Sequence, residues 1–157
     1  MRLLIAIPSA ALLISLANWP GPGSFGRSAL ADSLFDQYGA IRWKDEKARL
    51  DNFAIQLQQD EKLVGYILVF DAVGGCAGEA QARAIRAKRY VVEHRGISWD
   101  RVIWRREGYM DGISTILQPV SRGTVLPFPF RGWAIEGRSR TSTRACKTVL
   151  ERIRKDR

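Results

Sequence analysis

A nearly unbroken apolar run, Leu63 to Phe70, constrains the fold of this chain more than any other feature. Its length and β-branched residues favour a strand, and its lack of alternation predicts burial on both faces, as at the centre of a sheet. A glycine-rich loop, Asp71 to Gly78, comes next. An amphipathic helix then runs from Glu79 to a stop at Gly96, and a further strand covers Arg101 to Glu107. This order predicts a βαβ unit.

Two elements are expected before the apolar run. The aromatic and apolar residues of Phe35 to Trp43 indicate a short, irregular strand with a bulge at Gly39. Asp45 then has the character of a helix N-cap, and the helix is expected to end near Gln59. Four apolar residues of this segment follow helical spacing and mark its buried face. They are Leu50, Phe53, Ala54 and Leu57.

After the βαβ unit, Ser114 to Val120 is predicted as a fourth strand that forms a hairpin with the third. Two prolines keep Leu126 to Phe130 out of a sheet and predict an extended strap. A last amphipathic helix is expected from Thr141 onward. The predicted fold class is α/β (α+β): a βαβαβ(β) two-layer sandwich with helices packed on a mixed four-stranded sheet.

The N-terminus has the pattern of a signal peptide. Arg2 precedes the apolar run Leu3 to Leu16, and small residues allow cleavage after Ala31 or after Ala17. The run is shorter than the ~20 residues that span a bilayer, so an uncleaved membrane anchor is the weaker interpretation. We therefore expect residues 1–31 to be a signal peptide and the protein to be periplasmic or secreted.

The net charge of +9 favours an anionic partner or serves solubility alone. Residues 131–157 hold nine basic and three acidic side chains, so the C-terminal region could attract nucleic acid or anionic lipid. Export argues against nucleic acid. Both cysteines, Cys76 and Cys146, lie in the exported part, where they either form a disulfide or remain two buried small residues. With no CxxC motif and one histidine, no metal site is expected.

The element order resembles that of the OmpA-like domain family, whose members bind peptidoglycan in bacterial envelopes. The resemblance covers roughly Phe35 to Val120. It implies an OmpA-like domain at 32–122, followed by a strap and a basic C-terminal helix at 123–157. The segment between Tyr90 and Gly96 has one residue more than the family pattern. The residues that carry the resemblance are Leu50 to Leu57, Arg83-Ala84, Tyr90-Val91, Gly96-Ile97, Arg101-Val102 and Gly108-Tyr109.

The resemblance implies a ligand site. In the family, an Asp after the second strand and an Arg on the second helix hold the diaminopimelate of the stem peptide, through its ammonium and its carboxylate. The matching positions are Asp71 and Arg83, with Arg86 as a second choice one turn on. The residues allow a plainer interpretation too, in which Asp71 caps its loop and Arg83 pairs with Glu79.

Two functions follow as expectations. The first is an exported, non-catalytic envelope module that binds peptidoglycan stem peptide or another envelope component. The alternative is a protein–protein adaptor that uses the basic C-terminal region and the aromatic residues Phe128, Phe130 and Trp133, with the wall site lost. An enzyme is not expected, since nucleophile-elbow, phosphate-loop and metal-spacing motifs are absent and His94 sits at a helix end. No cofactor is expected.

Overall fold

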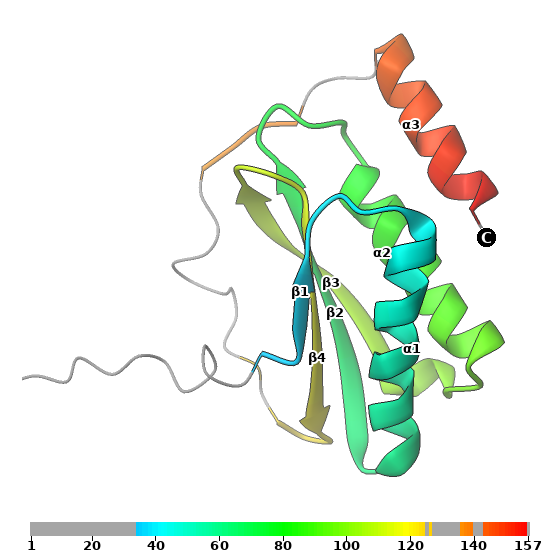
Figure 1. Cartoon of the computed structure of the whole chain (residues 1–157). Helices are drawn as coiled ribbons and strands as arrows, with labels where there is room; N and C mark the ends of the chain where they lie inside the picture. Colours follow the sequence, from blue (N-terminus) through cyan, green and yellow to red (C-terminus); the bar gives the residue numbers. More distant parts are fainter. Residues whose placement is uncertain (1–33, 125, 127–135, 140–142, 157) are drawn as a thin grey trace, which may run out of the picture.

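The computed structural model describes residues 34–124, 126, 136–139 and 143–156. Three helices pack with a four-stranded mixed sheet, in the predicted order, so the predicted α/β sandwich is confirmed. Figure 1 shows α1 and α2 on one face of the sheet and α3 against the outside of α2. The bounds are β1 Asp36–Tyr38, α1 Trp43–Gln59, β2 Leu63–Ala72, α2 Glu79–Arg89, β3 Val102–Met110, β4 Ser114–Ser121 and α3 Arg144–Lys155.

The sheet has the strand order β1-β4-β2-β3. β2 pairs in parallel with β3 and antiparallel with β4, which makes the sheet mixed as predicted. The predicted hairpin is wrong, because β3 and β4 lie on opposite sides of β2. Strands two positions apart are separated by roughly 9.6 Å, a distance that residues 111–113 can cross at about 3.8 Å per residue. In this position β4 pairs along both edges, with β2 and with β1.

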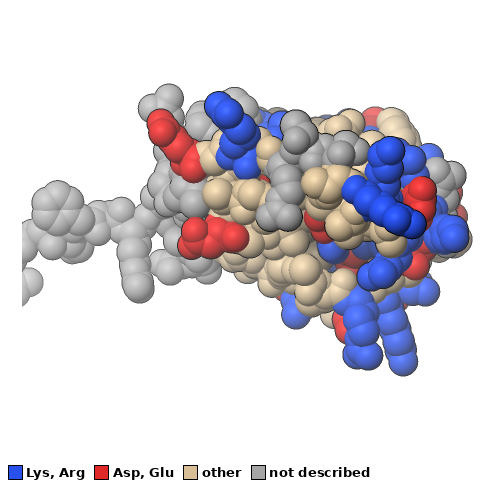
Figure 2. All heavy atoms as spheres, turned by 90° about the horizontal axis from the view of Figure 1, so that it is seen from above, with Lys and Arg blue, Asp and Glu red and all other residues tan. Residues whose placement is uncertain are grey.

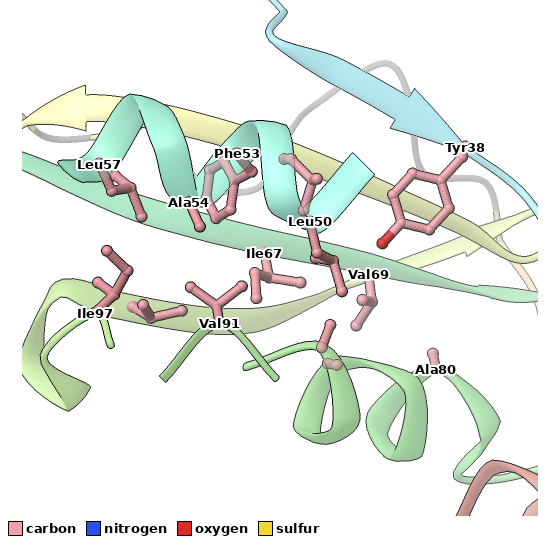
Figure 3. Close-up of a cluster of buried hydrophobic side chains, with 14 residues drawn as sticks. Tyr38, Leu50, Phe53, Ala54, Leu57, Ile67, Val69, Ala80, Val91 and Ile97 are labelled. Atoms are coloured by element: carbon pink, nitrogen blue, oxygen red, sulfur yellow. The ribbon is translucent and has the colours of Figure 1, made fainter. Parts of the chain in front are cut away.

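α1 packs directly on β2. The four residues predicted for its buried face are all fully buried, and they meet Ile67 and Val69 of the strand (Figure 3). Gly65 makes this close approach feasible. A Cβ atom at Gly65 would lie 2.5 Å from Phe53 Cζ and 2.7 Å from Leu57 Cδ1, too near for either side chain to keep its place.

The other face of β2 is buried as well. Leu68 and Phe70 form a second cluster with Ile116 of β4, and all three are fully buried. The prediction that this strand is buried on both faces is therefore confirmed. Burial on both faces lets this strand contribute apolar area to both clusters.

The first two elements begin differently from the prediction. The strand covers only Asp36–Tyr38, and α1 begins at Trp43, with Arg42 at the N-cap position. The prediction that Asp45 is the N-cap is wrong. Asp45 lies in the first turn, where the helix dipole stabilises its negative charge, and it pairs with Arg42 at 2.9 Å.

α2 lies close to the sheet because its inner face consists of small residues. Ala80, Ala84 and Ala87 are buried, and Val91 continues this row into a π turn at Tyr90–His94. A π turn holds more residues than an α turn. Gly96 ends the segment at a φ of +71°.

α3 is attached to the domain by a disulfide. Cys76, in the loop after β2, is bonded to Cys146 in the first turn of α3, so the disulfide is the one of the two predicted alternatives that the structure contains. The Thr143 hydroxyl caps this helix by accepting the Cys146 N–H at 3.2 Å. The predicted signal peptide and most of the strap lie outside the described residues. In the part that is described, no helix is both long and apolar enough to cross a bilayer.

Candidate functional site

Asp71 lies at the carboxyl end of β2, beside a hollow of about 260 Å³ that we call the Asp71 hollow. The side chain is buried and accepts a hydrogen bond from Nε of Arg106, on the parallel strand β3. Clefts at the carboxyl ends of parallel strands are common ligand sites. Besides Asp71, the polar groups of the hollow come from Arg106, Tyr109, Arg138 and Ser139, with Gln81 on the α2 side.

Asp71, Arg106, Tyr109 and Ser139 form a connected hydrogen-bond network. Arg106 donates to the Tyr109 hydroxyl at 3.0 Å, and the Ser139 hydroxyl donates to the same oxygen at 3.4 Å. The hydrogen bond from Ser139 and the charge of Arg106 lower the pKa of Tyr109, while the hydrogen bond to Asp71 raises the pKa of Arg106. The hollow therefore combines one buried carboxylate with fixed cationic and hydroxyl groups.

Segment 136–139 closes one side of the hollow. The Gly74 N–H donates to the Arg138 carbonyl at 3.0 Å, which holds the segment over the loop after β2. A Cβ atom at Gly137 would lie 2.8 Å from the Tyr109 side chain, so this backbone lies directly against β3. The Arg138 side chain is exposed and forms no ion pair with any other described residue.

Arg83 lies elsewhere. It donates to Glu79 Oε1 from Nε at 3.1 Å and from Nη2 at 2.9 Å, as in the plainer interpretation of the sequence. Arg83 is not among the described residues that line the Asp71 hollow. Its charge lowers the pKa of Glu46 on α1, against the larger effect of burial.

Arg86 is buried between helices. It forms an ion pair with Glu46, reaches Asp156 Oδ2 at 3.3 Å and stacks over the Trp43 ring at 4.2 Å. Burial raises the pKa of Glu46, although the charge of Arg86 opposes that rise. The structure thus pairs Arg83 with Glu79, Arg86 with Glu46 and Arg106 with Asp71.

A second, larger hollow of about 650 Å³ runs between α2 and α3, and we call it the α2–α3 groove. Trp43, Ile85, Tyr90 and Leu150 give it apolar walls, and arginines lie along its rim. Ala77, Gly78 and Gln81 line both this groove and the Asp71 hollow, so the two adjoin at the start of α2.

The sequence did not indicate several of these residues. Arg106 and Tyr109 reach Asp71 through the β2–β3 pairing, in which Asp71 stands opposite Tyr109. The choice of neighbouring strand is not encoded in local periodicity. Arg138 and Ser139 carry no local signal. The one lining residue that the sequence did indicate is Asp71, through its position at the end of the apolar strand.

The described residues thus define a mixed α/β domain with a charged hollow and an apolar groove, and they contain no group of His, Cys, Asp and Glu suited to a metal ion. Comparisons with protein-family models, curated proteins and solved structures find no match for the chain.

Proposed function

We propose that this protein is an exported, non-catalytic envelope module that binds the stem peptide of peptidoglycan in the Asp71 hollow. The observation that carries the proposal is the buried carboxylate of Asp71 beside the guanidinium of Arg106, with Arg138 at the rim. Diaminopimelate ends in an ammonium and a carboxylate on one carbon, so its recognition needs an acid and a base side by side. The disulfide supports export, because such bonds persist in oxidising compartments.

In this proposal Asp71 keeps Arg106 and gains the ligand ammonium. A carboxylate has about four acceptor positions, so one guanidinium donor does not saturate it. Arg138 is the cation best placed to take the ligand carboxylate, because its side chain is exposed at the rim. Arg83 would first have to leave Glu79. The hollow, at about 260 Å³, suits one amino-acid end group rather than a whole sugar chain.

Co-sedimentation with purified peptidoglycan tests the proposal. We expect retention on diaminopimelate-type wall and weak retention on lysine-type wall, since a lysine side chain ends in an ammonium alone. Asp71→Asn should abolish retention and Arg138→Met should weaken it about tenfold or more. The matched control is Asp36→Asn. It removes a carboxylate of β1 that pairs with Arg49 of α1, away from the hollow.

Two results would overturn the proposal. One is a wild-type protein that stays in solution with both wall types. The other is retention that persists in Asp71→Asn. If Arg83→Met abolishes retention while Arg138→Met does not, the stem-peptide proposal stands and the carboxylate contact moves to Arg83.

A further inference from the structure

The α2–α3 groove is long. Its lining positions recur every three or four residues from Gly78 to His94, along one face of α2 and its π turn. At 1.5 Å per residue this face extends over roughly 24 Å. α3 forms the opposite wall only near its end, through Leu150, Ile153 and Arg154. A site of this shape takes an elongated ligand.

The walls of the groove are apolar. Ile85 is 39% exposed, although it lies at the middle of the groove. Trp43 and Tyr90 stand edge to face at 5.5 Å on the α1 side, and Leu150 faces them from α3. Ile85 is the exposed member of this apolar surface, and its part-buried neighbours extend the surface on both sides, which suits contact with a partner.

The rim of the groove is basic. Its open charged side chains are Arg89, Arg154 and Glu93, which give a formal charge of +1, whereas Arg86 lies beneath the rim in ion pairs with Glu46 and Asp156. Arg86 Nε is buried and has no hydrogen-bond partner among the described groups. Figure 2 shows Lys and Arg gathered on the side of the molecule where the helices lie. Charge complementarity therefore calls for an acidic occupant.

The groove offers no backbone pairing. Both long walls are helices, whose N–H and C=O groups are engaged within each helix, so an extended peptide would find no strand edge there. An occupant that satisfies its own backbone avoids this cost. We propose that the α2–α3 groove binds an acidic amphipathic helix of a partner protein, with its apolar face on Ile85 and its carboxylates on the arginine rim. This site adjoins the stem-peptide site at the start of α2, but the charged residues that line the two differ.

The test uses a synthetic helical peptide of about 16 residues, matched to the length of the groove, with a leucine stripe flanked by glutamates. A companion peptide carries lysines in place of the glutamates. Fluorescence anisotropy should show binding of the glutamate peptide, which weakens as salt rises, and at least about tenfold weaker binding of the lysine peptide.

Two matched variants locate the site. Ile85→Glu should weaken binding about tenfold or more, whereas Ile55→Glu should not. Ile55 lies on α1 outside the groove, with 38% exposure against 39% for Ile85. Asp71→Asn should bind the peptide normally, so failure of the stem-peptide proposal leaves this one intact.

Three outcomes of the peptide assays would overturn the inference. They are no binding of the glutamate peptide, equal binding of the lysine peptide, and equal losses in Ile85→Glu and Ile55→Glu. Sedimentation that reveals a dimer lost in Ile85→Glu would assign the groove to a second copy of this chain, and would overturn the inference too.

Discussion

Arg86 of α2 and Glu46 of α1 form an ion pair that is almost hidden from solvent, with 6% and 1% of their side chains exposed. Arg86 additionally reaches Asp156, just beyond α3, at 3.3 Å. One guanidinium therefore connects all three helices. Removing one member of a buried pair leaves an uncompensated charge, which costs far more than losing an exposed pair.

Arg86→Met should lower the free energy of unfolding by about 3–5 kcal/mol, because Glu46 would stay buried without its partner. Urea denaturation followed by circular dichroism measures this. The matched control is Arg89→Met, which removes an exposed pair with Glu93 on the same helix and should cost about 0.5 kcal/mol or less. Equal losses in the two variants would contradict the prediction. Arg86→Met/Glu46→Leu should be more stable than Arg86→Met.

Glu46 should make stability depend on pH in a defined direction. Burial raises its pKa in the folded protein above the ordinary value of 4.5. Between the unfolded and folded pKa values, the folded state holds a proton on Glu46 that the unfolded state lacks. The stability that Glu46 contributes therefore rises as pH falls through the raised pKa, and it is complete below 4.5. The unfolding free energy of wild type minus that of Glu46→Gln should therefore increase as the pH falls from neutral toward 4.5. A constant or decreasing difference would contradict this.

Gly65→Ala should destabilise the fold by about 1–3 kcal/mol, because the new methyl group would overlap Phe53 and Leu57. Thermal unfolding provides the measurement. Gly112→Ala serves as the control, since a Cβ atom there meets no atom within 4 Å and its φ is not in the left-handed region. A Gly65→Ala/Phe53→Leu variant that recovers part of the loss would identify the overlap as the cause.

Replacing both cysteines, as Cys76→Ser/Cys146→Ser, should lower the unfolding free energy by about 2–4 kcal/mol, because a cross-link between distant residues restricts the unfolded chain. The two positions are 70 residues apart in sequence. Hydrogen exchange should quicken most in α3, which the bond holds against α2. Unchanged exchange in α3 would show that Ile153 and Asp156 suffice to hold it.

The parts of the fold that periodicity determines were predictable. The apolar spacing of α1 and the continuous apolar run of β2 depend only on which residues lie a few positions apart, and both predictions are confirmed. The β3–β4 connection was not predictable in this way. A turn of three residues suits a hairpin, but β4 gains two neighbours when it inserts between β1 and β2.

The residues of the candidate site were likewise predictable only in part. Asp71 was found because a polar residue at the end of a buried strand is visible in the sequence. Arg106 and Arg138 reach it only through the strand order and the position of segment 136–139. Nothing in the sequence marks Glu46 as buried, yet Arg86 and Tyr38 surround it in the interior. Side-chain burial of this kind depends on how helices are placed against each other.

The bond between Cys76 and Cys146 closes the backbone between them into a covalent ring. A single proteolytic cut anywhere within that ring would open it without releasing either piece. The terminal helix would thus travel with the rest of the molecule after such a cut, and only chemical reduction would let the fragments part.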